Sequence, residues 1–335
     1  MKASSCFLPL FFLATQLNAS QNSNGFRHFS IQHKKHGPIN YHISSPEFEK
    51  SKPVLLYLDG SGHYPLLMLT PKGKGSTIPF DTDSLSRMYH LVVISKPGIP
   101  FEDSVQYGGP IGIDYPEPEE YAKRLSFDWR YETALAVLNE LPKKISVANQ
   151  FYGILGISEG AQVAPSVAAS FKPCKALITI GGNAVNQFYD FTTNARLMAE
   201  RGEISYEDAE YIVDSLHQVY REIYAEPFST TKRWYGHTYL RWASFCSREP
   251  LNEYLKLNIP VYVAYGSADE NTILNIDLLR HAYNRLNKTN LTMKTYPGLD
   301  HFFRDKKNTD QSKGNPYKEV IKNCMNWLMN QLNGK

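Results

Sequence analysis

The sequence predicts an α/β fold built on a mainly parallel β-sheet. Several short apolar runs are continuous rather than alternating, which is typical of strands buried on both faces of a parallel sheet. Helix-like segments lie between several of these runs, and this alternation favours parallel strands joined by helical crossovers. The chain has 335 residues, 42% of them hydrophobic, which is enough to bury a large core.

About eight strands are expected along the chain. The first two, Phe26–His33 and Ile39–Ile43, are joined by the turn-like tripeptide His36-Gly37-Pro38. Six apolar runs mark the others: Pro53–Leu58, Leu91–Ile94, Phe151–Ile157, Ala176–Ile180, Val261–Tyr265 and Leu291–Tyr296. Helical spacing of apolar residues predicts helices over Phe127–Leu141 and, facing the core, near the C-terminus from Val320 to Leu332.

One interval is too long to be a simple crossover, because about 75 residues separate the sixth and seventh strands. Within it, Ser205 and Asp208 form a capping-box pattern that opens a helix, and apolar residues at helical spacing continue until Pro227. We therefore expect one domain over residues 20–335 that carries a helical cap insertion at about 185–257.

Residues 1–19 have the pattern of a secretory signal peptide. Lys2 precedes the nine-residue apolar stretch Cys6–Ala14, and polar residues then lead to the small Ala19. Nine apolar residues are too few for a membrane-spanning helix, which needs about 20. We expect cleavage near Ala19–Ser20 and a secreted or periplasmic protein without a stable membrane span; an anchoring or buried N-terminus is the alternative.

Composition narrows the classes of function. The 36 basic and 33 acidic residues show no basic stripe, so nucleic-acid binding is not expected; without Lys2 the net charge is 35 − 33 = +2. Cys174, Cys246 and Cys324 lack the spacing of a zinc site, and their pairing in a disulfide stays open. No glycine-rich dinucleotide or phosphate loop is present, so neither a cofactor nor a metal is expected.

The most informative motif is Gly156-Ile157-Ser158-Glu159-Gly160, a G-x-S-x-G sequence at the end of a predicted buried strand. Flanking glycines allow the sharp strand-to-helix turn that exposes a nucleophilic serine, and the Ala-rich segment 161–171 supplies the following helix. Pro165 is a departure from this pattern, since a proline at that depth is expected to kink or shorten the helix. The alternative is a serine that merely occupies a turn.

A nucleophilic serine needs a general base and an orienting carboxylate. Asp269 and His301 each follow a predicted strand, so the carboxyl ends of parallel strands should bring them close to Ser158. Asp300 and Glu270 are rival carboxylates, but Asp300 is adjacent to the histidine and the Gly-x-x-Asp spacing favours Asp269.

With Ser158, Asp269 and His301 in this order, the chain resembles the α/β-hydrolase superfamily over most of residues 26–335. The resemblance implies Ser158 as nucleophile, His301 as general base and acid, and Asp269 as the group that orients the imidazole. It also implies an oxyanion hole formed by the backbone N–H groups of Glu159 and Ser61, with Gly62 as the alternative to Ser61. Asp59-Gly60 stands where the superfamily often has His-Gly, so the loop that would supply the second donor departs from the superfamily's pattern.

These residues predict a serine hydrolase, and the resemblance implies that it cleaves a carboxylic ester of a small-molecule or acyl substrate. An aminopeptidase-type serine peptidase, a thioesterase or an acyltransferase would use the same triad, and a non-catalytic binding module would use the same fold. A peptidase that trims amino termini would need a carboxylate in the cap to bind the ammonium group of its substrate. Four glutamates are available there: Glu200, Glu203, Glu207 and Glu210. His63 and the aromatic cap residues 234–245 either contact substrate or only support a turn and the packing of the cap.

Overall fold

The computed structural model describes residues 25–108, 113–270, 272–305 and 315–334. The proposed leader, residues 1–19, lies outside them. The α/β class is confirmed by an eight-stranded sheet in the order β1-β2-β6-β3-β10-β11-β14-β15. The strands are β1 (Phe26–His33), β2 (Gly37–Ser44), β3 (Lys52–Leu58), β6 (His90–Ile94), β10 (Val147–Ile157), β11 (Cys174–Ile180), β14 (Val261–Gly266) and β15 (Leu291–Tyr296).

The sheet is antiparallel at one edge and parallel elsewhere. β1 pairs antiparallel with β2, and β2 with β6, whereas the five remaining pairings are parallel. All seven residues of β3 and all five of β6 are buried, as continuous apolar runs predict for strands covered on both faces. Six parallel strands therefore end at one edge, which is where an α/β sheet places its site.

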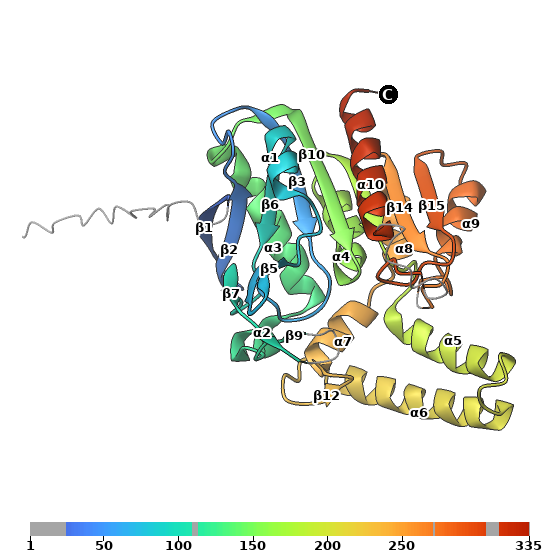
Figure 1. The fold of residues 1–335 in the computed structure, drawn as a ribbon. Coiled ribbons are helices and arrows are strands. Elements are labelled where there is room, and N and C mark those ends of the chain that lie inside the picture. Colours follow the sequence, from blue (N-terminus) through green and yellow to red (C-terminus); the bar gives the residue numbers. More distant parts are fainter. Residues whose placement is uncertain (1–24, 109–112, 271, 306–314, 335) are drawn as a thin grey trace, which may run out of the picture.

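Two helical layers cover the sheet (Figure 1). One face packs against α3 (Phe127–Glu140), α4 (Glu159–Ser170), α8 (Pro250–Lys256) and α9 (Asp277–Arg285), and the other against α1 (Thr82–Met88) and α10 (Pro316–Leu332). The predicted helix 127–141 and the C-terminal helix are both present. α4 continues through Pro165, so the expected shortening is not seen.

The interval between β11 and β14 is helical. It contains α5 (Gln187–Glu200), α6 (Tyr206–Ala225), α7 (Tyr239–Cys246) and α8, with a two-stranded ribbon of β12 (Arg233–Trp234) and β13 (His237–Thr238). The side chain of Ser205 accepts a hydrogen bond from the Asp208 N–H, as the capping-box pattern predicts. α5, α6 and α7 lie beyond the carboxyl ends of the parallel strands, and we call them the cap (Figure 1).

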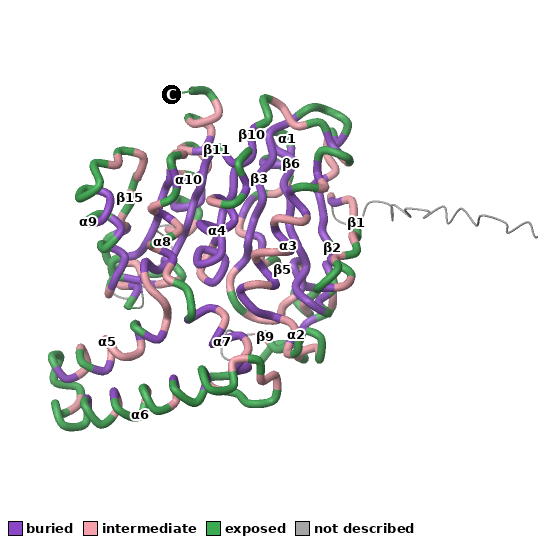
Figure 2. Tube along the Cα trace, turned by 180° about the vertical axis from the view of Figure 1, so that it is seen from behind, coloured by how far each residue is buried: buried purple, intermediate pink, exposed green. Residues whose placement is uncertain are grey.

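The cap has its own apolar cluster. Phe188, Tyr220 and Trp242 are buried there, and the Phe188 and Tyr220 rings stack with centroids 4.0 Å apart. These rings therefore pack the cap helices against one another, which is the structural alternative to a substrate wall. The outer side of the α5–α6 hairpin is exposed, whereas the sheet beside it is buried (Figure 2).

Short strands that the sequence patterns did not predict complete the structure. β4 (Leu67–Thr70), β5 (Gly73–Ser76) and β7 (Glu102–Ser104) form a small sheet, and β8 (Gln106–Tyr107) pairs with β9 (Ile113–Asp114). A short helix, α2 (Glu119–Arg124), and a single 3₁₀ turn, Leu141–Lys143, lie on either side of α3. Cys174, Cys246 and Cys324 are buried free thiols. Among the helices that the structure describes, none is both long and apolar enough to span a bilayer.

Candidate active site

Ser158 occupies a strained turn between β10 and α4. Its backbone has φ 53° and ψ −116°, a positive-φ conformation that is costly for a residue with a side chain. The flanking glycines make the turn feasible, because a Cβ on Gly156 would lie 2.3 Å from the Gly160 oxygen and one on Gly160 would lie 2.0 Å from the Leu58 oxygen. Strain of this kind projects the serine hydroxyl from the edge of the sheet.

The structure brings Ser158, His301 and Asp269 together although they are far apart in sequence. His301 Nε2 lies 3.0 Å from Ser158 Oγ, and His301 Nδ1 lies 2.7 Å from Asp269 Oδ2. Asp269 is 1% exposed, and the Thr272 hydroxyl donates to the same carboxylate oxygen at 2.8 Å. The three groups form a hydrogen-bonded chain from a buried carboxylate to a half-buried hydroxyl.

The charges around His301 favour an imidazole that can take up a proton. Burial alone would lower the pKa of His301, but its hydrogen bond to Asp269 and the charge of that carboxylate raise the pKa above its usual value. Burial would raise the pKa of Asp269, and its bonds to His301 and Thr272 outweigh burial and lower it. The carboxylate therefore stays ionised while the imidazole titrates.

The alternative residues lie in other roles. Asp300 accepts from the Phe302 and Arg304 N–H groups and pairs with the Arg304 guanidinium, which holds it in its own turn. His63 makes a 2.9 Å hydrogen bond through Nε2 to the Tyr115 carbonyl, consistent with the turn interpretation. Glu270 is exposed.

Three of the four cap acids that were candidates for binding an ammonium group are engaged at the tip of the α5–α6 hairpin. Glu203 pairs with Arg201, Glu210 with Arg196, and Glu200 accepts from the Tyr206 hydroxyl. Glu207 is exposed in the first turn of α6. The hairpin tip projects away from the sheet (Figure 1).

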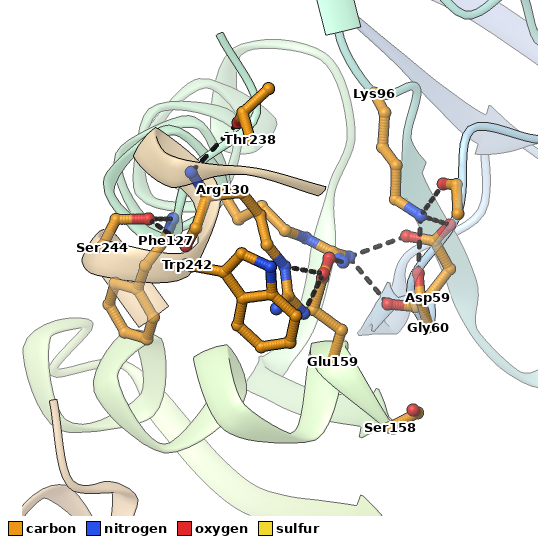
Figure 3. A network of polar contacts seen from close by, with 12 residues as sticks. Asp59, Gly60, Lys96, Phe127, Arg130, Ser158, Glu159, Thr238, Trp242 and Ser244 are labelled. Carbon is orange, nitrogen blue, oxygen red and sulfur yellow. Dashed lines mark hydrogen bonds and ion pairs between the residues drawn. The ribbon is translucent and has the colours of Figure 1, made fainter. Parts of the chain in front are cut away.

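A buried charge network lies beside Ser158 (Figure 3). Its members are Asp59, Lys96, Arg130, Glu159 and Arg241, each no more than 6% exposed. Arg130 bridges the two acids, at 2.7 Å from Asp59 Oδ1 and 2.7 Å from Glu159 Oε1. Lys96 pairs with Asp59 at 2.8 Å, and Arg241 of the cap helix α7 pairs with Glu159 at 2.9 Å.

Charge pairing decides the ionisation of this network. Burial would raise the pKa of Glu159, but Arg241, Arg130 and Lys96 hold it well below its usual range. Burial acts against the charge of Arg130, and Asp59 and Glu159 together still raise its pKa. Both groups are therefore fixed ions at any pH near neutrality.

Two backbone N–H groups predicted for the oxyanion hole border this network. Glu159 is the first residue of α4, and Ser61 follows β3 in the loop Asp59-Gly60-Ser61-Gly62. Neither N–H finds an acceptor within the described part of the chain. Gly60 places this loop beside Ser158, since a Cβ on it would lie 3.5 Å from Ser158 Cβ.

Sequence reasoning missed the side chains of the charge network. The signal for one of them was present: Arg130 occupies the same helical face as the buried Ala134 and Val137. A charge on an apolar face needs a buried partner, because an unpaired ion there is costly.

One cluster of potential metal ligands is found among the described residues, at the β1–β2 turn. His33, His36 and Glu132 offer atoms within 4.8 Å of one another. Glu132 is already paired with Lys35 at 2.8 Å and with His36 Nε2 at 2.7 Å, and the His33 and His36 rings stack. This cluster therefore lacks the arrangement of a formed metal centre.

Comparison with known proteins gives matches among solved structures only. No protein-family model and no curated sequence matches the chain. Among solved structures, Pyrococcus horikoshii acylaminoacyl peptidase is 14% identical with a TM-score of 0.57, covering 92% of this chain and 42% of that one. Porphyromonas gingivalis dipeptidyl peptidase 4 is 14% identical with a TM-score of 0.55, covering 91% of this chain and 35% of that one.

This chain thus spans less than half the length of either solved chain. At such low identity the likeness concerns the fold, and it confirms the α/β-hydrolase fold that the sequence motif implied.

Proposed function

We propose that this chain, which has the α/β-hydrolase fold, is a serine hydrolase that cleaves carboxylic esters through an acyl-enzyme. The observation that carries the proposal is the chain of contacts from Ser158 Oγ to His301 at 3.0 Å and from His301 to Asp269 at 2.7 Å. A hydroxyl in contact with an imidazole that a buried carboxylate orients is the arrangement of an activated nucleophile.

In the first step, Ser158 Oγ attacks the ester carbonyl carbon while His301 Nε2 takes the hydroxyl proton. Asp269 stabilises the resulting imidazolium and holds Nδ1–H toward itself. The carbonyl oxygen, on which negative charge develops, accepts hydrogen bonds from the N–H groups of Glu159 and Ser61. His301 then gives its proton to the departing alcohol, which leaves the acyl group on Ser158.

In the second step, water replaces the alcohol. His301 Nε2 takes a proton from water as the water oxygen attacks the acyl carbon, and the same N–H groups hold the second oxyanion. When this intermediate collapses, His301 returns the proton to Ser158 Oγ and the carboxylic acid leaves. No atom outside the triad, the two N–H groups and water is required.

The preference for an ester over a peptide rests on the cap acids. The carboxylates considered for an amino-terminal ammonium are engaged or exposed on the α5–α6 hairpin, as described above. A thioesterase or acyltransferase would use the same steps with another leaving group or acceptor, and we treat these as outcomes of the substrate test. Export through residues 1–19 is part of the proposal.

Labelling with a fluorophosphonate probe tests the proposal. We expect the wild-type protein to react at Ser158 and the folded variants Ser158→Ala and His301→Ala to lose labelling. A panel of 4-nitrophenyl esters, an acyl thioester and aminoacyl anilides then assigns the bond cleaved, and the esters should be hydrolysed fastest. A folded wild-type protein that neither reacts with the probe nor turns over any of these substrates would point to a binding module instead.

A further inference from the structure

Lys96 follows β6, and its buried side chain binds the loop 59–62 beside Ser158. Its ammonium donates to the carbonyl oxygens of Gly60 at 2.5 Å and Gly62 at 2.8 Å, and it pairs with Asp59 at 2.8 Å. The residue is 5% exposed. An ammonium has three donor hydrogens, and each of these three acceptors can take one.

These bonds fix the direction of the peptide group that follows Gly60. In a planar trans peptide the carbonyl and the N–H of the next residue point in opposite directions, and no cis peptide occurs among the described residues. Because the Gly60 carbonyl points at Lys96, the Ser61 N–H points away from Lys96. Gly60 lies between Lys96 and Ser158, so this direction is toward the nucleophile's side of the loop (Figure 3).

We propose that Lys96 is a positioning residue that aims the Ser61 N–H as the second oxyanion donor. This inference rests on the proposed function and deepens it, because it selects Ser61 rather than Gly62. Lys96 does not touch the substrate; it acts through the Gly60–Ser61 peptide. Asp59 keeps the ammonium in place, and Arg130 joins Asp59 to Glu159, the residue that supplies the first donor.

The chain contains a matched control for a purely structural lysine. Lys52, at the start of β3, is also 5% exposed and also donates to two backbone carbonyls, Pro46 at 2.7 Å and Ser86 at 2.6 Å. It lies at the opposite end of β3 from the loop 59–62. Removing either ammonium takes a donor from two backbone carbonyls, but only Lys96 borders the site, and only Lys96 also pairs with a carboxylate, that of Asp59.

The experiment compares Lys96→Met and Lys52→Met with wild type in hydrolysis of 4-nitrophenyl butyrate and in inhibition by phenylboronic acid, which forms a tetrahedral adduct on serine. For Lys96→Met we expect kcat to fall about 10²-fold, as for loss of one oxyanion donor, and phenylboronic acid to bind more weakly. KM should stay within about threefold, because the donor acts in the transition state. Lys52→Met should keep kcat within about threefold while its melting temperature falls.

A folded Lys96→Met protein with near-wild-type kcat, or a Lys52→Met protein that loses as much kcat as Lys96→Met, would overturn the inference. If Lys96→Met does not fold, Lys96→Gln serves in its place. Its amide retains donor hydrogens, so an intermediate loss of kcat supports the inference and wild-type kcat contradicts it. Failure of wild type to react with a fluorophosphonate refutes the proposed function itself, so the two failures are distinguishable.

Discussion

The two sides of Ser158 are built from different kinds of contact. On one side, His301 and Asp269 form a short chain; burial alone would lower the pKa of the central imidazole, and the Asp269 carboxylate raises it above the usual histidine value. On the other side, the charge network contains three cations and two acids, and pairing keeps Glu159 and Arg130 ionised. A group that transfers a proton, as proposed for His301, must change its protonation state. Groups that only hold backbone donors in place, as proposed for the charge network, must keep theirs.

Because of this difference, we expect triad substitutions to change mainly the reaction rate and charge-network substitutions to change the stability of the fold. Losing the Ser158 hydroxyl or the His301 imidazole should remove chemistry and leave the fold intact, because both side chains are only half-buried. Losing a member of the charge network should destabilise the fold, because its partners are left with fewer opposite charges in a buried setting.

The largest effect is expected at the nucleophile. Ser158→Ala should lower kcat for a 4-nitrophenyl ester by about 10⁴-fold or more, because the covalent route is lost. Its free energy of unfolding, measured by urea titration, should stay within about 1 kcal/mol of wild type. A variant that keeps a substantial part of its esterase activity would show that another group is the nucleophile.

Asp269→Asn should follow, with kcat falling about 10⁴-fold because the imidazole loses the carboxylate that sets its tautomer. In wild type, kcat/KM should rise with pH as His301 loses its proton, with a midpoint above the ordinary histidine value of about 6.5. Losing the carboxylate removes the cause of this shift, so the residual activity of the variant should have a lower midpoint. Asp300→Asn is the control, and an equal loss there would reassign the orienting carboxylate.

Arg130→Met tests how much the charge network contributes to the stability of the fold. It leaves Asp59 and Glu159 each with one cation fewer in a buried setting, so the free energy of unfolding should fall by about 3–5 kcal/mol. Arg201→Met, which breaks an exposed pair with Glu203, should cost less than about 1 kcal/mol in the same urea titration. Similar losses in both variants would mean that the network is not a stabilising element.

Asp190 sharpens the contrast because it is a buried carboxyl with amide rather than cationic partners. It is 4% exposed and accepts from the amides of Asn183 and Asn275, and burial raises its pKa to about 8 from 3.8. The folded protein then binds a proton between about pH 4 and pH 8 that the unfolded chain releases, so stability falls as pH rises through this range.

We expect Asp190 to lower the free energy of unfolding by about 1–3 kcal/mol between pH 5 and pH 8, and Asp190→Asn to flatten that dependence. Thermal melts of both proteins across this range provide the measurement. An unchanged pH profile in the variant would show that Asp190 is ionised in the fold without penalty.

The sheet and the three triad residues could be predicted from the sequence, because strands and the residues that follow them are marked by local patterns. Apolar runs mark the buried strands, and Ser158, Asp269 and His301 each follow one, so parallel strand ends place them at one edge. The geometry at that edge agrees with a motif whose glycines are required by contacts under 3 Å.

The charge network was beyond such reasoning. Asp59, Lys96 and Arg130 come from separate segments, and Arg241 belongs to the cap, so no spacing links them in sequence. Short strands such as β5, with the sequence GKGS, lack any apolar pattern and form only through pairing with neighbours. Long-range pairing and charge complementarity become visible only once the chain is folded.

The central claim is that Ser158 carries the acyl group. Rapid quenching of the wild-type protein with 4-nitrophenyl acetate, followed by intact-mass measurement and peptide mapping, tests it directly. We predict one acetyl group on the peptide that contains Ser158, absent from the folded Ser158→Ala variant. Turnover of the ester with the acetyl group on another residue, or in the Ser158→Ala variant at the wild-type rate, would contradict the account.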